Sequence, residues 1–454
     1  MDYRTLNPAT GELVEMFETL TEKDLECAID AAAGAYTSWH RTPLGERCAA
    51  LQRAGDLLEN HADELADVMA LEMGKPVAQG KAEAAKCALV CRHYAEHAEA
   101  MLAPESRESG ASRSFVRHDP LGPILAIMPW NFPFWQFFRF AAPALAAGNV
   151  VLLKHAPNTP RCGLDIERLL REAAFPEHVV QNLFISHEQA AGVISDPRVR
   201  GVTLTGSTRA GRDVAATAGR HLKKMVMELG GSDPFIVFDD ADLEQAVEVG
   251  VAARCQNSGQ SCIAAKRFLV QEPVYDRFLD AFVEAMRGQT VGPPQDETTD
   301  IGPLARRDLR NRLVDQVNET VWKGARVLTG GSAPESPGFY YPPTVLEEVD
   351  ARSPAATQEL FGPVASLFPF TDEMDAAVIA GRTSYGLAAS IWTHDAERIY
   401  HLIPELEFGS VFVNGQVKSD PRLPFGGVKE SGFGRELGRE GMLEFVNAKT
   451  VWVR

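Results

Sequence analysis

The segment from Leu121 to Leu153 constrains the possible folds most, because Arg139 is its only charged residue. A stretch this apolar forms either a membrane-spanning helix or part of a buried core. Four prolines interrupt it, at positions 123, 129, 133 and 143. Each proline lacks the N–H that a continuous helix needs. We therefore expect a buried strand, a turn, a buried helix and a second buried strand, and no membrane segment.

Strand-like and helical patterns alternate along the rest of the chain. Ala-, Leu- and Glu-rich helical patterns cover 21–39, 43–73 and 80–102. Apolar strand patterns and a further helix follow at 124–128, 150–153, 163 onward, 179–184 and 199–204. A second run begins near Gly231 and continues to about Phe425. This order predicts an α/β fold with mainly parallel, covered sheets.

Composition excludes several classes of function. With 454 residues, the chain is too long for one core. A net charge of −17 and the absence of a basic cluster argue against a nucleic-acid partner. Seven cysteines without paired spacing, and an N-terminus without a signal-peptide pattern, favour a reducing, cytoplasmic location.

A metal site is not expected at the most suggestive cluster, Cys87, Cys91, His93 and His97. On a helix the two cysteines share one face and the two histidines lie largely opposite, so four ligands cannot converge.

Cys262 differs from the other cysteines in its surroundings. It follows the small polar sequence Gly259-Gln260-Ser261 and precedes a strand pattern at 267–270. A thiol at such a bend can attack a carbonyl carbon while its own backbone N–H points at the carbonyl oxygen. An ordinary buried thiol is the alternative, and we expect it for the other six cysteines.

Three further motifs could complete such a site. Glu228 ends a strand pattern before two glycines and could act as a general base, with a salt bridge or cap as the alternative. Asn131, between two prolines, could donate to an oxyanion or simply form a turn. Gly206 and Ser207 follow a strand and open a helix, where backbone N–H groups bind pyrophosphate, although similar turns cap many helices.

Together these motifs resemble the NAD(P)-dependent aldehyde dehydrogenase superfamily over nearly the whole chain. The motifs, in the family's order and spacing, are Asn-Pro-Ala-Thr-Gly at 7–11, Pro-Trp-Asn-Phe-Pro at 129–133, Thr-Gly-Ser-Thr at 205–208, Glu-Leu-Gly-Gly at 228–231, Gly-Gln-Ser-Cys at 259–262, Glu-x-Phe-Gly-Pro at 359–363 and Pro-Phe-Gly-Gly at 424–427.

The resemblance implies two Rossmann-like α/β domains and a small β oligomerisation flap. The expected boundaries are 1–110 with 124–230 for the cofactor-binding domain, 231–430 for the catalytic domain, and 111–123 with 431–454 for the flap. A homodimer or homotetramer is also implied. Strand patterns in the flap would have free edges that require a partner.

By the same resemblance, Cys262 attacks the aldehyde to give a thiohemiacetal. Its oxyanion lies against the Asn131 amide and the Cys262 backbone N–H. Hydride transfer to the nicotinamide leaves a thioester, and Glu228 activates the water that hydrolyses it. Glu228 would also help to deprotonate the thiol, whose ordinary pKa of about 8.5 leaves it mostly protonated at neutral pH.

The resemblance also assigns the cofactor contacts. Trp130 would form the nicotinamide-side wall, and Glu359 would hold the nicotinamide ribose with Phe361 packed nearby. Lys154 would bind the adenosine ribose, and Gly206 and Ser207 would hold the pyrophosphate.

The choice of cofactor is predicted from a position at which this sequence differs from the family's pattern. NAD-preferring members often carry a glutamate three residues after the matched lysine, and here that residue is Pro157. A carboxylate there would bind the ribose 2′-hydroxyl and repel a 2′-phosphate. Without it, Lys154, together with His155, would face an unguarded pocket. We expect NADP⁺ to be accepted and preferred over NAD⁺.

The substrate prediction rests on Arg139. A buried guanidinium needs an anion, either a protein carboxylate or a substrate carboxylate. Arg139 resembles the carboxylate-binding arginine of succinate semialdehyde dehydrogenases, and Ser419 resembles their helping serine. Their second arginine is Gln256 here, where Gln256 and Lys418 could supply hydrogen bonds. The expected substrate is succinate semialdehyde or a similar short carboxylated aldehyde.

Two rival functions remain open from the sequence. In a broad-specificity aliphatic aldehyde dehydrogenase, Arg139 would be structural. In a Cys-Glu thioesterase, Cys262 would act without any nicotinamide.

Overall fold

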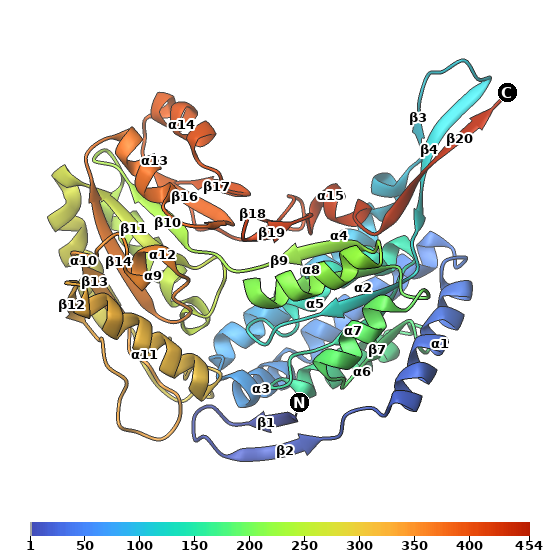
Figure 1. Ribbon diagram of the computed structural model, residues 1–454, viewed down its shortest axis with the longest axis horizontal. Helices are drawn as coiled ribbons and strands as arrows, with labels where there is room; N and C mark the ends of the chain where they lie inside the picture. The colour runs from blue at the N-terminus through green and yellow to red at the C-terminus, as the bar shows by residue number, and fades with distance from the viewer. Residues whose placement is uncertain (1) are drawn as a thin grey trace.

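The chain forms two α/β lobes and a β arm in the computed structural model, which describes residues 2–454 (Figure 1). A six-stranded sheet in the order β19-β9-β8-β5-β6-β7 centres the first lobe. A seven-stranded sheet in the order β12-β13-β14-β11-β10-β16-β17 centres the second lobe, at the left of Figure 1. The predicted α/β fold is confirmed.

Five parallel strands form most of the first sheet: β5 (Pro123–Ile127), β6 (Val150–Lys154), β7 (Val180–Asn182), β8 (Gly201–Thr205) and β9 (Lys224–Glu228). They are apolar and largely buried, as parallel strands covered by helices are. The helices of this lobe are α1 (Glu22–Trp39), α2 (Leu44–Asn60), α3 (Ala62–Met73), α4 (Val77–Leu102), α5 (Trp135–Ala147), α6 (Pro160–Glu172), α7 (His187–Ser195) and α8 (Thr208–Arg220). The N-terminal hairpin of β1 (Tyr3–Leu6) and β2 (Leu13–Phe17) completes it.

The apolar segment from Leu121 to Leu153 forms the predicted strand, turn, helix and strand. Every residue of α5 is buried, including Arg139. No helix among residues 2–454 is long and apolar enough to cross a membrane. One helical prediction was too long: the pattern at 43–73 breaks at His61 into α2 and α3.

The second sheet is parallel except for one edge strand. Its parallel strands are β10 (Asp233–Val237), β11 (Ala265–Gln271), β13 (Thr344–Glu347), β14 (Val364–Phe370), β16 (Ala388–Trp392) and β17 (Ser410–Val413), and β12 (Arg326–Thr329) is antiparallel to β13. Its helices are α9 (Leu243–Cys255), α10 (Tyr275–Arg287), α11 (Arg307–Trp322), α12 (Pro354–Thr357), α13 (Glu373–Gly381) and α14 (Ala396–Leu402). The short strands β15 (Tyr385–Gly386) and β18 (Val428–Lys429) pair separately. Three short 3₁₀ helices are η1 (Gln256–Gly259), η2 (Glu272–Val274) and η3 (Ile403–Glu405).

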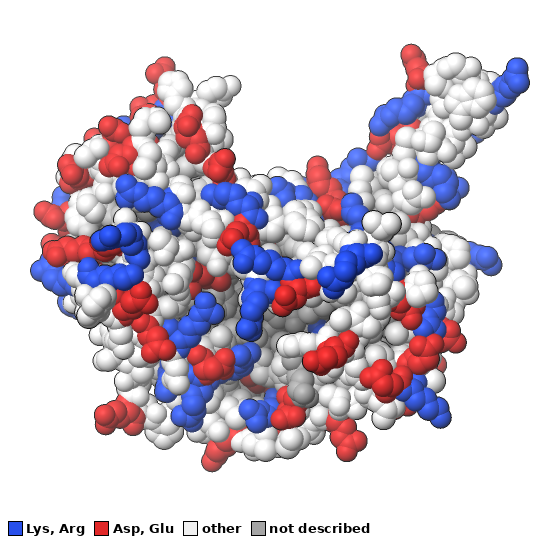
Figure 2. Space-filling model, in the orientation of Figure 1, with Lys and Arg blue, Asp and Glu red and all other residues white. Residues whose placement is uncertain are grey.

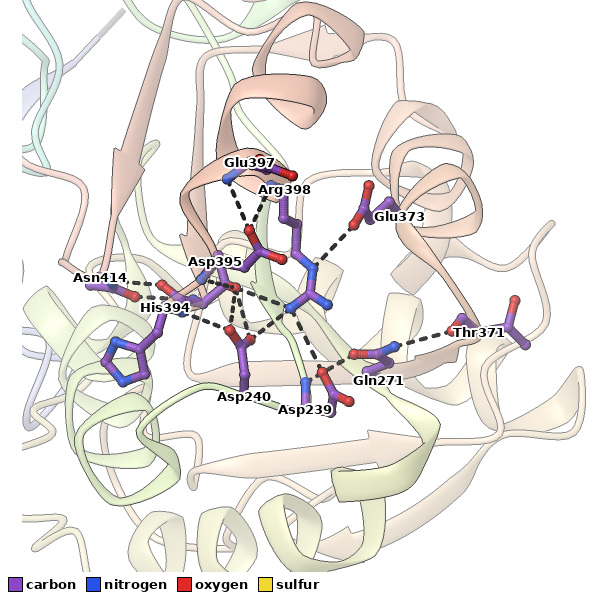
Figure 3. Close-up of polar contacts among 11 residues, drawn as sticks. Asp239, Asp240, Gln271, Thr371, Glu373, His394, Asp395, Glu397, Arg398 and Asn414 are labelled. Atoms are coloured by element: carbon purple, nitrogen blue, oxygen red, sulfur yellow. Dashed lines mark hydrogen bonds and ion pairs between the residues drawn. The ribbon is translucent and has the colours of Figure 1, made fainter.

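A charged network fastens the carboxyl ends of this sheet to α13 and α14 (Figure 3). The Arg398 guanidinium donates to Asp240 at 2.7 Å and to Glu373 at 3.2 Å. Asp240 also accepts from Thr393, which follows β16, at 2.8 Å. These bonds satisfy several partly buried groups at one end of the sheet. Cys262 and Glu359 lie at the opposite end of the sheet, because they precede β11 and β14.

The β arm consists of β20 (Val446–Val453), β4 (Arg113–Pro120) and β3 (Glu105–Ser106) in that order. Two elements depart from the predicted boundaries. β3 joins the arm, although 1–110 was assigned to the first lobe. β19 (Gly432–Phe433), assigned to the flap, returns to the first sheet, where it completes the free edge of β9. The remaining domain boundaries stay predictions.

After β19, the helix α15 (Gly438–Leu443) also returns to the first lobe. The Tyr94 hydroxyl on α4 donates to the carbonyl oxygen of Gly438 at 3.0 Å.

Candidate active site

The candidate site lies where the carboxyl ends of the first sheet meet the amino ends of the second. Asn131 and Gly206 follow β5 and β8, and Glu228 ends β9. Cys262 and Glu359 instead precede β11 and β14. Ligands of open parallel sheets bind at the carboxyl ends of the strands. The second lobe thus brings its nucleophile to the ligand-binding edge of the first.

Cys262 is held by a turn with an unusual backbone. Asn257, Ser258 and Gly259 have φ values of 56°, 55° and 73°. A Cβ on Gly259 would lie 2.3 Å from the carbonyl carbon of Gly362, so only glycine fits. The Asn257 amide donates to the carbonyl oxygens of Asn131 at 2.7 Å and Gln260 at 3.0 Å. The turn is thereby tied to the loop that carries Asn131.

Lys266 braces the same turn from within β11. Its ammonium donates to the carbonyl oxygens of Ser261, Cys262 and Ala264 at 3.0, 2.8 and 3.2 Å. Sequence reasoning missed this residue. The available signal was a lysine inside a strand that otherwise reads as buried.

Two cavities meet at Cys262. One, of about 430 Å³, is lined by Lys86, Arg139, Gln256, Ser419 and Phe425 among others. The other, of about 490 Å³, is lined by Trp130, Asn131, Gly206, Ser207, Glu359 and Phe361 among others. Cys262 and Gln136 line both. We call the first the substrate cavity and the second the cofactor cavity. The thiol therefore stands between two separate spaces.

Asn131 is placed to act as a hydrogen-bond donor beside the thiol. Its side chain is buried, and Nδ2 donates to the carbonyl oxygen of Gln260 at 3.0 Å. A carboxamide nitrogen carries two hydrogens, so one remains for a ligand in the cofactor cavity.

The thiol itself is neutral in this arrangement. Burial raises the pKa of Cys262 to about 12, while the charges of Arg139 and Lys266 act in the opposite direction. Ionisation at neutral pH therefore requires a base or additional positive charge.

Glu228 is buried and lines neither cavity. Burial raises the pKa of its carboxyl well above the usual range; Arg139 opposes this shift and Glu436 adds to it. Its Oε1 has no hydrogen-bond partner among residues 2–454. A protonated carboxyl cannot accept a proton from water, so the predicted general-base role requires the side chain to turn toward the thiol and ionise. That role stays a prediction.

Arg139 has a protein counter-ion. Its guanidinium forms a buried ion pair with Glu436 and stacks on the Phe425 ring, with 4.5 Å to the ring centroid. A protein carboxylate, the alternative open from the sequence, is therefore present beside Arg139. Arg139 still lines the substrate cavity, so a secondary contact with substrate stays a prediction.

Of the other predicted substrate ligands, two line the substrate cavity and one does not. Gln256 and Ser419 line the substrate cavity, whereas Lys418 is exposed and does not.

The nucleotide end of the site agrees with the prediction only in part. Lys154 ends β6, and burial lowers its pKa to about 8, but it does not line the cofactor cavity. His155 is wholly buried and contacts the carbonyl oxygen of Pro133 at 3.0 Å, and burial lowers its pKa to about 4. It is therefore neutral, and the expectation that it faces the nucleotide pocket is wrong.

The cofactor cavity fits a dinucleotide. Ser207 caps α8, and the buried Thr208 hydroxyl has no partner among residues 2–454. Oε1 of Glu359 accepts from the N–H of Gly231 at 3.0 Å, while the side chain remains partly exposed to the cavity. Arg209 and Arg312 add positive charge to the lining, and Figure 2 shows Lys and Arg side chains gathered where the two lobes meet.

Trp130, which is predicted to form the nicotinamide-side wall, meets Phe361 edge to face with ring centroids 5.7 Å apart. Among residues 2–454, no group of three His, Cys, Asp or Glu side chains is arranged to hold a metal ion.

The chain belongs to the aldehyde dehydrogenase family, whose model matches residues 1–451. A relative from Synechocystis sp., named as a probable NADP(+) succinate-semialdehyde dehydrogenase, is 51% identical over 453 residues and covers 100% of both chains. An NADP(+) succinate-semialdehyde dehydrogenase from Mycobacterium bovis is 47% identical over 456 residues, with 100% of both chains covered.

Solved structures agree with these matches. The structure of Gox0499 superposes with a TM-score of 0.98 at 41% identity, over 100% of both chains. The succinic semialdehyde dehydrogenase of Streptococcus pyogenes, solved with NADP+, gives a TM-score of 0.97 at 36% identity, over 99% of both chains.

Replacing Lys266 tests whether its positive charge lowers the pKa of the Cys262 thiol. We expect Lys266→Met to slow alkylation of Cys262 by iodoacetamide about tenfold at fixed pH, because loss of a nearby cation raises the pKa of the thiol. Mass spectrometry of the Cys262 peptide separates this signal from the other cysteines. Lys23→Met, at an exposed lysine of α1, is the control. An unchanged alkylation rate in Lys266→Met would contradict the role assigned to the ammonium.

Proposed function

We propose that this protein oxidises succinate semialdehyde, or a similar short carboxylated aldehyde, to the acid with NADP⁺. The observation that carries the proposal is the position of Cys262, which separates the cofactor cavity of about 490 Å³ from a second cavity containing cationic side chains. The names of the relatives from Synechocystis sp. and Mycobacterium bovis support the substrate and the cofactor.

The side chains divide the reaction as follows. The Cys262 thiol passes its proton to the ionised Glu228 carboxylate as the sulfur attacks the aldehyde carbon, and the carbonyl oxygen accepts hydrogen bonds from the Asn131 amide and the Cys262 N–H. Bound NADP⁺ supplies the hydride acceptor. Trp130, Ser207 and Glu359 would hold it. Glu228, once ionised and turned toward the sulfur, takes a proton from the water that hydrolyses the thioester on Cys262.

Kinetics with single substitutions test this function. With succinate semialdehyde and NADP⁺, the wild-type protein should form reduced nicotinamide, and Cys262→Ala should abolish the reaction. Glu228→Gln should slow steady turnover about 100-fold or more, the usual contribution of a general base. The first turnover should slow less than steady turnover, because solvent can also take the thiol proton, whereas hydrolysis of the thioester depends on Glu228.

Two outcomes would favour the rival functions. Equal kcat/KM values for succinate semialdehyde and butanal would indicate a broad aliphatic aldehyde dehydrogenase. Thioester hydrolysis without any nicotinamide reduction across an aldehyde panel would indicate a thioesterase.

The preference for NADP⁺ is tested at Pro157. We expect Pro157→Glu to shift the ratio of kcat/KM values toward NAD⁺ about tenfold, because a carboxylate there binds a ribose 2′-hydroxyl and repels a 2′-phosphate. Pro334→Glu places the same charge in a remote exposed loop and is the control. A wild-type kcat/KM more than tenfold higher with NAD⁺ would contradict the proposed preference.

A homodimer or homotetramer through the β arm is part of the proposal. β20 lies at the outer edge of its sheet, and 54% of Trp452 is exposed there. Edge strands of this kind pair with further strands. Trp452→Asp should lower the mass measured by light scattering, whereas Trp322→Asp, at an exposed tryptophan of α11, should not. A monomeric wild-type protein would rule the assembly out.

We also place the protein in a reducing compartment such as the cytoplasm, because all seven cysteines are free thiols.

A further inference from the structure

Lys86 is a cation of the substrate cavity that the sequence did not single out. It lies on α4 and lines the same cavity as Cys262 and Ser419. Its ammonium donates to the Ser419 hydroxyl at 2.8 Å and lies over the Trp135 ring, 4.2 Å from the centroid. These two contacts fix where the charge is presented.

No ion pair joins Lys86 to a carboxylate anywhere in residues 2–454. The two acids whose charges raise the pKa of Lys86 are Glu83 and Asp420. Glu83 pairs with Lys75 and accepts from the backbone N–H groups of Phe134 and Trp135. Asp420 accepts from the Arg422 guanidinium at 2.6 Å. Both acids are therefore engaged elsewhere.

The second cation of the cavity differs in this respect. Arg139 is paired with the buried Glu436, so its charge is largely compensated before any ligand enters. Asp300, also in the cavity lining, is exposed and accepts from the N–H of Thr290 at 2.8 Å. Lys86 is thus the cation of this lining that keeps a free charge.

The protonation behaviour of Lys86 agrees with an anion site. Burial lowers its pKa to about 8, and the charge of Arg139 acts in the same direction. Cys87, Glu83 and Asp420 act in the opposite direction. An entering carboxylate would replace the lost solvation and favour the charged form.

We propose that Lys86, oriented by Ser419 and Trp135, binds the carboxylate of the aldehyde substrate and so sets the preference for short acidic aldehydes. This inference rests on the proposed function and names the residue responsible for its substrate class. Arg139 is then a structural neighbour that compensates Glu436.

Lys86→Met tests the assignment by comparing succinate semialdehyde with butanal, which has the same number of carbons and no charge. We expect kcat/KM for succinate semialdehyde to fall about 100-fold, mainly through KM, because a charge-assisted hydrogen bond is lost. The value for butanal should change less than about threefold, since a nonpolar chain makes no such bond. Lys81→Met is the matched control, because Lys81 lies on α4 but pairs with Asp63 and Glu297 outside the cavity.

Arg139→Met provides the contrast. It should lower kcat/KM for both aldehydes, because it leaves Glu436 buried without a partner. The proposal is overturned if Lys86→Met affects both aldehydes equally or neither, or if Arg139→Met alone is selective for succinate semialdehyde. A wild-type protein without preference for succinate semialdehyde would instead refute the proposed function itself.

A measurement on the wild-type protein avoids dependence on any variant's folding. The ratio of kcat/KM for succinate semialdehyde to that for butanal should fall as pH rises through about 8, because Lys86 then loses its charge. Effects of the Cys262 thiol cancel in this ratio. Lys86→Gln, which keeps a hydrogen-bond donor without the charge, should show a low and pH-independent ratio. A wild-type ratio that stays constant above pH 8 would contradict the proposal.

Discussion

The backbone of the nucleophile turn is the constraint on which the site depends. Three successive residues, Asn257 to Gly259, lie in the left-handed region, which costs about 1 kcal/mol or more for each residue that has a side chain. Hydrogen bonds offset this cost: the Ser258 hydroxyl accepts from the N–H of Gly302 at 2.9 Å, and Arg254 donates to the Gly259 carbonyl at 2.7 Å. The hydrogen-bonded turn keeps Cys262 between the two cavities.

The opposed sheets explain why the site needs both lobes. The carboxyl ends of the first sheet supply Asn131 and the N-terminus of α8, and the amino ends of the second supply Cys262 and Glu359. The crossover between the sheets is correspondingly tight, since a Cβ on Gly231 would lie 2.6 Å from the Cys262 carbonyl oxygen. Neither lobe alone has both the nucleophile and the side-chain amide that would help to stabilise its oxyanion.

Local patterns predicted much of this arrangement, and long-range electrostatics account for most of what they missed. The pattern of the apolar segment from Leu121 to Leu153 predicted β5, α5 and β6, because strand and helix periodicities are local. The position of Cys262 followed from its turn. The partner of Arg139 could not be predicted, because Glu436 lies far along the chain in a segment assigned to the flap. Lys86 was hidden for the same reason, since Ser419 belongs to the other lobe.

The distribution of charge in the substrate cavity depends on which cation is paired with a carboxylate of the protein. Arg139 pairs with Glu436, and its charge also lowers the pKa of Glu228. Lys86 carries a compact charge on a flexible stem, and its bond to Ser419 crosses from α4 to the second lobe. The contact that orients the ammonium therefore also joins the two lobes beside the thiol. A ligand bound at Lys86 would lie against both lobes, which places its far end at a fixed distance from the junction where Cys262 stands.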